Sequence, residues 1–416
     1  MQLWAYSRMM SRRGCLRLQG GKASCPCLYS CRAYTTYTLG SGWMGGLGLG
    51  DFEDVDKAVP IPTLEAVNMR TIVAGWAHTV GIDDNGHVLI WGRPFDFKTL
   101  LRLERWRNIP FITRISSWVN SREGDGVQML MPEPQRVLLG QSETERAVSV
   151  AASAALTAVV SDTGAVYCLG SNNYGQCGIG SEYPYTTYEL KEPVVGAIQG
   201  QKAIQAGVGL QHVIALSETG DVFVWGKGQR GQLGNGADGD SSAALQVSLP
   251  ESAVQVSAGF NHCAALSKSG KLYIWGKMMS PRVLKELHKT KLHRDQYLPL
   301  LVECGPSKVP GVELCCSNGN TAVRLADGTV WVHGFTSDTK EIVHQPMKAE
   351  GLKAKRLLRG FKHVYAETDN GGIVVLDLCS DKIYMEPIEL AGMEDRLEDV
   401  ASVAKGWRHT VVLLKP

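Results

Sequence analysis

The sequence predicts an all-β protein, a closed ring of seven blades that each hold a small β-sheet. Three observations lead to this fold class. A segment of fixed pattern recurs about every 55 residues. The copies contain a β-hairpin with continuously apolar strands. The last copy lacks one strand of this hairpin, and a matching strand stands alone near the start of the chain.

Residues 204–236, IQAGVGLQHVIALSETGDVFVWGKGQRGQLGNG, show the repeat unit most clearly. Gly209 and His212 form a G-x-x-H step, and two apolar segments flank a Ser-Glu-Thr-Gly turn, which predicts an antiparallel hairpin. The Gly-rich stretch after Gly226 predicts a turn, because glycine tolerates positive φ. The apolar run 222–225 predicts a strand that neighbouring blades bury on both faces.

Seven copies align on the histidine position, which Leu156 occupies in the second copy and Asn320 in the fifth. The glycine and histidine of the step are Gly75 and His78, Gly209 and His212, Gly259 and His262, Gly360 and His363, and Gly406 and His409. Because they recur once per blade, we interpret them as structural, with each histidine bonding backbone across a blade boundary. Large rings are predicted to fill the space between blades, each with an indole N–H that needs a partner: Trp91, Trp225 and Trp275.

The seventh copy starts at Val403 and ends before the second strand of its hairpin. Residues 34–40, YTTYTLG, followed by the Gly-rich SGWMGGLGLGD, supply the strand and turn that it lacks. We expect this strand to pair with residues 410–414. Such pairing closes the ring over residues 34–416 and removes the exposed edges of an open sheet.

The patterns G-x-x-H-T, G-x-V-x-x-W-G and G-x-x-G-Q-L-G-x-G resemble the repeat of the regulator of chromosome condensation family. The resemblance covers about residues 34–416 and implies a seven-bladed β-propeller. Units one, three and four follow the pattern best, whereas units five and six lack the Gly-rich turn. The motif SNNYGQCG in unit two is most similar to the mitochondrial branch of the family.

Residues 1–33 have the composition of a mitochondrial transit peptide, because they are rich in arginine, contain serine and precede the first acidic residue, Asp51. This composition predicts a mitochondrial protein, in the matrix or associated with the inner membrane, that is cleaved before Tyr34. The alternatives are a disordered basic tail, or a start codon assigned upstream of Met9 or Met10.

The overall composition gives no sign of a catalytic site. The net charge is +2, and no apolar run is long enough for a transmembrane helix. Phosphate-loop, zinc-protease and nucleophile-elbow motifs are absent, and Cys25, Cys27 and Cys31 lack the spacing of a zinc ribbon. We therefore expect no catalytic residue, cofactor or metal.

Two insertions, at about residues 93–146 and 277–310, interrupt the repeat. Residues 93–122 contain seven basic and two acidic side chains with aromatic residues between them, a composition that suits RNA. The alternative is a partly helical insertion whose aromatic rings pack on the propeller while its arginines face water. The candidate binding residues are Arg102, Arg105, Trp106, Arg107 and Arg114.

The second insertion has a similar composition, with six basic and two acidic residues between 277 and 296 and the pattern of a short helix after Pro281. The alternative is the solvated face of a lid helix. Both insertions follow a Trp-Gly strand, so they leave equivalent corners of the ring and could form one basic surface. The candidate residues here are Lys285, Lys289, Lys291 and Arg294.

Two functions follow. The first is a mitochondrial binding scaffold that supports ribosome assembly or RNA handling, with ribosomal RNA, the mitochondrial ribosome or other proteins as partners. The second, implied by the family resemblance, is guanine-nucleotide exchange on a small GTPase or a mitochondrial fusion dynamin. Exchange needs only loops that prefer the nucleotide-free GTPase. The short wedge hairpin that exchange would use is not evident in this sequence.

Overall fold

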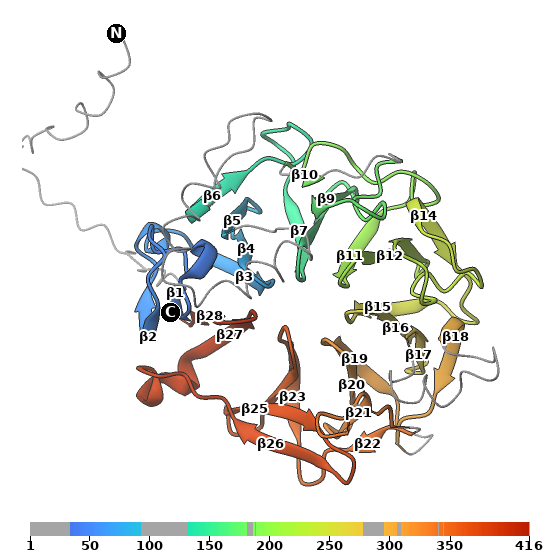
Figure 1. The fold of residues 1–416 in the computed structure, drawn as a ribbon. Coiled ribbons are helices and arrows are strands. Elements are labelled where there is room, and N and C mark those ends of the chain that lie inside the picture. Colours follow the sequence, from blue (N-terminus) through green and yellow to red (C-terminus); the bar gives the residue numbers. More distant parts are fainter. Residues whose placement is uncertain are drawn as a thin grey trace, which may run out of the picture. The chain divides into compact units, whose positions relative to one another are not determined.

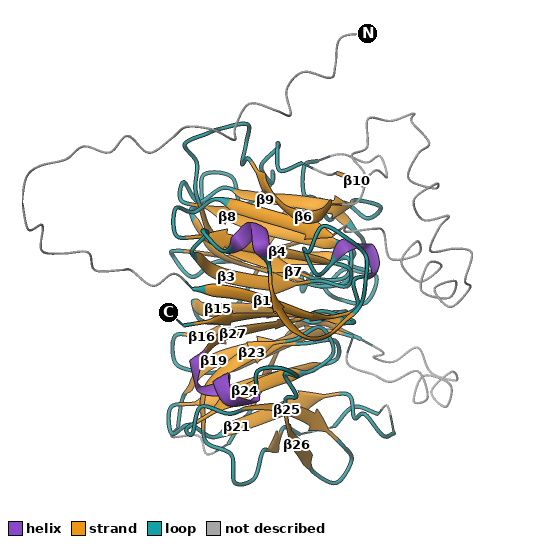
Figure 2. Ribbon diagram, turned by 90° about the vertical axis from the view of Figure 1, so that its left-hand side faces the viewer, coloured by secondary structure: helices purple, strands orange, loops and turns teal. Residues whose placement is uncertain are grey.

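Seven four-stranded antiparallel sheets stand around a common centre, which confirms the predicted seven-bladed propeller (Figure 1). The computed structural model describes residues 34–92, 131–180, 189–277, 295–305, 309–339, 341–343 and 345–415, and the backbone of residues 186–187. Among these residues the only helices are three short 3₁₀ turns, purple in Figure 2. They are η1 (Trp43–Gly45), η2 (Pro62–Leu64) and η3 (Glu394–Asp399).

Blades 1 to 6 take their strands in chain order from the centre outward (Figure 1). Blade 1 comprises β3 (Met69–Ala74), β4 (His78–Asp83), β5 (Val88–Gly92) and β6 (Met131–Val137). Blade 2 comprises β7 (Ala147–Ala152), β8 (Leu156–Ser161), β9 (Val166–Ser171) and β10 (Thr186–Thr187). Blade 3 comprises β11 (Ala203–Val208), β12 (His212–Ser217), β13 (Val222–Gly226) and β14 (Ser241–Val247).

The second half of the ring has the same order. Blade 4 comprises β15 (Ala253–Ala258), β16 (His262–Ser267), β17 (Leu272–Gly276) and β18 (Gln296–Val302). Blade 5 comprises β19 (Gly311–Cys316), β20 (Asn320–Leu325), β21 (Val330–Gly334) and β22 (Met347–Lys348). Blade 6 comprises β23 (Ala354–Arg359), β24 (Val364–Thr368), β25 (Ile373–Leu378) and β26 (Ile383–Pro387).

Blade 7 joins the two ends of the described chain. Its strands are β27 (Val400–Lys405), β28 (His409–Leu414), β1 (Thr35–Gly40) and β2 (Val55–Pro60), from the centre outward. β1 pairs with β28 without interruption, from Thr35 opposite Leu414 to Gly40 opposite His409. The predicted closure of the ring by these two strands is therefore confirmed.

The hydrophobic core lies between neighbouring blades rather than at one central point. Val222–Gly226 is buried along its whole length, as the apolar run predicts. One apolar cluster joins Val166 and Cys168 of blade 2 to Val213 and Phe223 of blade 3. Full burial of a valine or phenylalanine side chain stabilises the fold by about 1.5–3 kcal/mol. Several such side chains at one boundary therefore act as a small hydrophobic core.

The described ends of the two insertions are strands, not helices. β6 and β18 form the outermost strands of blades 1 and 4. The segments that the sequence predicts to be partly helical, and the basic leader, lie outside the described residues. In the part of the chain that the structure describes, no helix is long and apolar enough to cross a membrane.

Candidate functional site: the loop face of the ring

The two ends of the ring carry different segments. At one end, each blade has a short loop between its first and second strands, such as residues 75–77, and the segment that follows its third strand. His78 pairs with Gly92, and His262 pairs with Gly276, so these loops and segments leave from the same end. We call this end the loop face. Both insertions therefore start at equivalent corners of the loop face.

The repeat histidines join neighbouring blades through threonine side chains. The pairs are His78 with Thr157, His262 with Thr321 and His409 with Thr79, each with 2.9 Å between Nε2 and Oγ1. Each threonine directly follows the histidine position of the next blade. His212 cannot make this bond, because Cys263 stands in place of the threonine. The prediction of a contact across the boundary is confirmed. The predicted backbone partner is found for His212, at the backbone of His262, and for His409, at the backbone of His78, whereas the threonine partners were not predicted.

Burial keeps these histidines uncharged at neutral pH. It lowers the pKa of His78 and His262 to about 3, and the pKa of His212 and His409 to about 4. A buried imidazole resists protonation because the charged form loses its hydration. The described residues contain no group of three or more histidine, cysteine or carboxylate side chains arranged to hold a metal.

The glycine of the G-x-x-H step is required by the histidine ring. A Cβ at Gly209 would lie 2.1 Å from Cε1 of His212, and one at Gly259 would lie 2.0 Å from Cε1 of His262. Any side chain there would overlap the ring. Blades 2 and 5 lack both residues of the step and have Ser153 with Leu156, and Ser317 with Asn320. The glycine and the histidine are therefore absent together, for a steric reason.

Blade 6 keeps the motif but not the geometry. A Cβ at Gly360 would lie 2.1 Å from Cε2 of Tyr365, so the tyrosine ring takes the place of the histidine. The side chain of His363 is 33% exposed, and its Nδ1 lies 3.8 Å from Oδ1 of Asp377. The interpretation of His363 as a boundary histidine is wrong.

The tryptophans of the third strands lie between blades and have a partner for the indole N–H, as the sequence predicts. The partner, which the sequence did not predict, is the Gly-rich turn of the preceding blade. The Nε1–H group donates to a backbone carbonyl in each case: Trp91 to Gly46 at 3.0 Å, Trp225 to Gln176 at 2.9 Å and Trp275 to Gln232 at 2.9 Å. Gly178 has a φ of +68°, and a Cβ there would lie 2.8 Å from Nε1 of Trp225. The Gly-rich turn is thus shaped to receive the indole ring.

Aromatic rings from four loops meet at the centre of the loop face. Each ring follows the glycine of its G-x-x-H step. The ring centroids of Trp76 and Trp407 are 4.9 Å apart, and those of Phe260 and Phe361 are 5.0 Å apart. Contacts of this kind stabilise beyond the area that they bury. The loops of blades 1, 4, 6 and 7 are therefore fixed against one another.

Arg359 adds a polar contact across the centre. It is the last residue of β23, and its Nη2 donates to the carbonyls of Val208 at 2.6 Å and Ala258 at 3.0 Å. These carbonyls end β11 and β15, so one side chain joins blade 6 to blades 3 and 4. Burial lowers the pKa of Arg359. The loop face consequently has a rigid centre.

Three lysines on the loop face lie over aromatic rings. Nζ lies 4.4 Å from the ring centroid for Lys227 over Tyr174, 5.5 Å for Lys277 over Phe335 and 4.1 Å for Lys362 over Trp407. An ammonium group is attracted to the negative face of a ring. None of the three forms a salt bridge with another described residue. Their positive charges remain available to a ligand.

A cavity of about 470 Å³ opens on this face across blades 4 to 7. Its polar lining comprises Lys277 and Lys362, the amides of Asn261, Asn318 and Asn320, and the pair His363 and Asp377. It lies where blade 5 departs from the repeat, because Asn320 replaces the histidine and FTSDT replaces the Gly-rich turn after Gly334. We call this cavity the inter-blade pocket.

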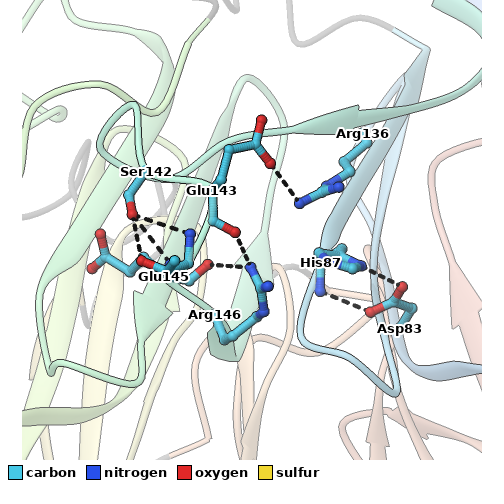
Figure 3. Close-up of polar contacts among 8 residues, drawn as sticks. Asp83, His87, Arg136, Ser142, Glu143, Glu145 and Arg146 are labelled. Atoms are coloured by element: carbon cyan, nitrogen blue, oxygen red, sulfur yellow. Dashed lines mark hydrogen bonds and ion pairs between the residues drawn. The ribbon is translucent and has the colours of Figure 1, made fainter.

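The opposite end of the ring pairs its own charges. Figure 3 shows this at the boundary of blades 1 and 2. Nδ1 of His87 lies 2.9 Å from Oδ2 of Asp83, and Nη2 of Arg136 lies 3.3 Å from Oε2 of Glu143. Arg146 also donates from Nη1 to the carbonyl of Glu143 at 2.7 Å. These groups satisfy one another, unlike the lysines of the loop face.

The binding residues that the sequence predicts on the two insertions lie outside the described residues and stay predictions. They are Arg102, Arg105, Trp106, Arg107, Arg114, Lys285, Lys289, Lys291 and Arg294. Sequence reasoning missed Lys227, Lys362 and the inter-blade pocket. A signal was present, because Lys227 directly follows a Trp-Gly pair and Lys362 precedes His363 inside a G-x-x-H step.

Comparison with protein families agrees with the geometry of the blades. A family model described as Regulator of chromosome condensation (RCC1) repeat matches residues 163–216 and 219–266, and a second model of that description matches residues 70–96 and 203–232. The chain contains regulator of chromosome condensation repeats. The matched residues lie in blades 1 to 4, and of these blades 1, 3 and 4 keep the glycine–histidine step and the tryptophan contact.

Similar curated proteins share about half of this chain. The Ultraviolet-B receptor UVR8 of Arabidopsis thaliana is 29% identical over 208 residues, and protein pim1 of Schizosaccharomyces pombe is 28% identical over 205 residues. These alignments cover 50% and 48% of this chain, but 40% and 34% of the two relatives. The chain thus matches less than half of the length of these repeat proteins.

Solved structures of similar fold cover nearly the whole ring. Human WBSCR16 superposes with a TM-score of 0.69 at 19% identity, over 92% of this chain and 99% of that one. Prp20p from Saccharomyces cerevisiae, reported with its binding to Gsp1p and histones, has a TM-score of 0.67 at 19% identity, over 92% of each chain. At this identity the likeness establishes the fold alone.

Proposed function

We propose that this protein is a binding scaffold in mitochondria that holds RNA or a ribonucleoprotein particle on its loop face and supports assembly of the mitochondrial ribosome. The observation that carries the proposal is the set of three lysines over aromatic rings, Lys227, Lys277 and Lys362. Ammonium groups attract phosphates, and aromatic rings can stack on unpaired bases, so this combination of lysines with half-buried rings suits single-stranded RNA.

The surroundings of these lysines support a binding role. The centre of the loop face is fixed by aromatic contacts and by Arg359, so the lysines have a rigid base. Both insertions start from this face, so their predicted basic residues would extend the same surface. The boundary histidines are neutral and engaged between blades, so the scaffold supplies no proton transfer through them.

Sedimentation of a mitochondrial lysate on a density gradient tests the proposal. We expect the protein to migrate with ribosomal particles and to move to light fractions after nuclease treatment. Migration as a free species, unchanged by nuclease, would contradict the scaffold role. Sequencing the N-terminus of the organelle protein checks the predicted location, with a start close to Tyr34 as the expected result.

Matched variants assign the interaction to the loop face. The variant K227Q/K277Q/K362Q is expected to leave the ribosomal fractions. The control K202Q/K268Q/K355Q removes the same charge at the opposite end of the ring, where Lys202, Lys268 and Lys355 adjoin the starts of inner strands or a hairpin turn. The control is expected to migrate like the unaltered protein. Equal behaviour of the two variants would exclude the loop-face lysines as the contact.

A second candidate function is guanine-nucleotide exchange on a GTPase. It is favoured by an open face of seven loops with a cavity at its side, a form that a globular partner can cover. The similarity in fold to Prp20p, which is reported to bind Gsp1p, points the same way. An exchange factor would form a stable complex with the nucleotide-free GTPase that GTP dissolves. A complex that GTP leaves intact would speak against exchange.

A further inference from the structure

We infer that the inter-blade pocket binds one nucleotide of single-stranded RNA, with the phosphate at Lys277 and Lys362 and the edge of the base at the asparagine amides. The inference rests on the proposed function, because it names the ligand of the same face. Four features of the described residues carry it: the place of the pocket in the repeat, an unpaired buried amide, the balance of charge, and the kinds of side chain in the lining.

The pocket exists because blade 5 lacks the parts that fill the same place elsewhere. In blade 4, the ring of His262 lies against Gly259 and reaches Thr321 of the next blade. In blade 5, the shorter Asn320 takes the histidine position, and a segment without the Gly-rich pattern follows Gly334. The missing ring and turn leave space that opens on the loop face.

Asn320 lines this space, and its side-chain oxygen is buried beneath the surface. The residue is 8% exposed, and its Oδ1 has no hydrogen-bond partner among the described residues. A buried carbonyl oxygen without a donor is unfavourable, so a turn of the amide that brings this oxygen to an N–H group of a ligand is stabilising. The edges of nucleobases carry such groups. Asn261 and Asn318 add two further amides that can both donate and accept.

The lining has an excess of positive charge. Among the described residues of the lining, Asp377 is the one carboxylate, and its Oδ2 accepts a hydrogen bond from Ser337 at 3.1 Å. Its other oxygen faces His363 at 3.8 Å. Neither Lys277 nor Lys362 forms an ion pair with a described carboxylate, and Asp295, whose charge acts on Lys277, is paired with Arg230 at 2.9 Å. Burial, followed by the charge of Arg230, lowers the pKa of Lys277, so an anion that entered would stabilise its ammonium form.

The remaining lining favours a nucleotide over an acidic peptide. Phe335 and Trp407 form part of the walls, and a volume of about 470 Å³ lies within the range of small-ligand sites. A carboxylate side chain of a peptide would use the lysines only. A nucleotide would use the lysines through its phosphate, Phe335 through an apolar contact with the base and the amides through the base edge.

Fluorescence anisotropy of a labelled single-stranded RNA with the full chain tests the inference. The variant K277Q/K362Q is expected to bind at least about tenfold more weakly, with a salt slope that falls by roughly 0.7 for each phosphate that the variant no longer binds. The matched control K202Q/K355Q, at the opposite end of the ring, is expected to bind within about twofold of the unaltered protein. Thermal unfolding of both variants checks that the ring is intact.

Asn320→Ala tests the base contact separately. In the unaltered protein we expect four homopolymer RNAs to differ in affinity, and in the variant we expect that difference to shrink while the salt slope stays the same. A salt slope that changes with this variant, or an unaltered base preference, would contradict the placement of the base edge at Asn320. Asp377→Asn removes the lining carboxylate and is expected to strengthen RNA binding.

The outcomes separate the pocket from the proposed function. If K277Q/K362Q binds RNA like the unaltered protein, the pocket inference is overturned and RNA binding by the remaining loop face stands. If the unaltered protein binds no RNA, the proposed function fails, and titration with nucleoside monophosphates then decides the pocket alone. The pocket inference is supported if the unaltered protein binds a monophosphate and K277Q/K362Q does not. It is overturned if the unaltered protein binds no monophosphate. Competition by polyglutamate as strong as that by RNA would identify an acidic protein as the ligand and overturn it.

Discussion

Blades 4 and 5 are neighbours with the same strand order, yet only blade 4 keeps the repeat chemistry. Blade 4 has Gly259 beneath His262, and its Trp275 donates to the preceding Gly-rich turn. Blade 5 has Ser317 and Asn320 at the corresponding step. Both blades nevertheless form four strands, and one apolar cluster joins them. The comparison teaches that apolar strands make a blade, whereas the motif residues tighten its boundary.

The largest expected effect is a loss of stability in acid at the boundaries that keep the histidine, which blade 5 lacks. The pKa of His78 and His262 is about 3 in the folded protein, and that of His212 and His409 is about 4, against 6.5 when unfolded. The unfolded chain therefore takes up protons first as the pH falls. The contribution of each histidine to the free energy of unfolding is fully present above pH 6.5. It decreases towards pH 4 by about 1.4 kcal/mol per pH unit for each histidine.

Urea unfolding at a series of pH values measures this decrease. His262→Asn gives blade 4 the residue that blade 5 has, and it should make the decline shallower by about 1.4 kcal/mol per pH unit between pH 6.5 and pH 4. A decline of unchanged steepness would mean that carboxylates, not the boundary histidines, cause the acid sensitivity.

Gly259→Ala is expected to destabilise the ring by about 3 kcal/mol, because the added Cβ would lie 2.0 Å from the ring of His262 and 2.5 Å from the carbonyl of Ser317. The urea midpoint reports the change. Gly239→Ala is the control, since nothing lies within 4 Å of a Cβ at Gly239. In blade 5, Ser317→Gly should change the midpoint little. A decrease there equal to that of Gly259→Ala would refute the steric link between the glycine and the histidine.

Trp225→Phe should have the smallest effect of the three, a destabilisation of about 1.5 kcal/mol, because the carbonyl of Gln176 loses the indole donor. Trp331 of blade 5 offers the comparison, since its buried Nε1 has no hydrogen-bond partner among the described residues. Trp331→Phe should therefore leave the urea midpoint unchanged or raise it. Equal destabilisation at the two positions would show that ring volume, and not the hydrogen bond, decides the stability of the boundary.

The fold could be predicted from the sequence because its determinants recur. The hairpin around Gly220 and the closing strand of residues 34–40 follow local rules of turn chemistry and apolar pattern. The sequence predicts that the indole N–H of Trp225 needs a partner, but it does not identify that partner, because the carbonyl of Gln176 comes from another blade. The threonine partners of the histidines were missed for the same reason, since a contact across 79 residues leaves no local signal.

The candidate site was harder to predict because it lies where the pattern fails. Asn320 in the histidine position marks blade 5 as unusual, but a sequence does not show whether the missing ring leaves a cavity or a collapsed boundary. The sequence placed His363 with the structural histidines on the strength of its motif. Tyr365, two residues further, decides otherwise by taking the space above Gly360, and only packing reveals this.

The pairing of β1 with β28 also governs how the chain can fold. Thr35 finds its partner Leu414 at the far end of the described chain, so the contact that completes the ring has a very large sequence separation. Bringing together the ends of so long a segment costs loop entropy, and this cost becomes small only after the intervening blades have formed. β1 can pair early with the nearby β2, but its other edge pairs with β28 only when the ring closes. Until then the open edges of β1 and β28 can pair with another chain instead.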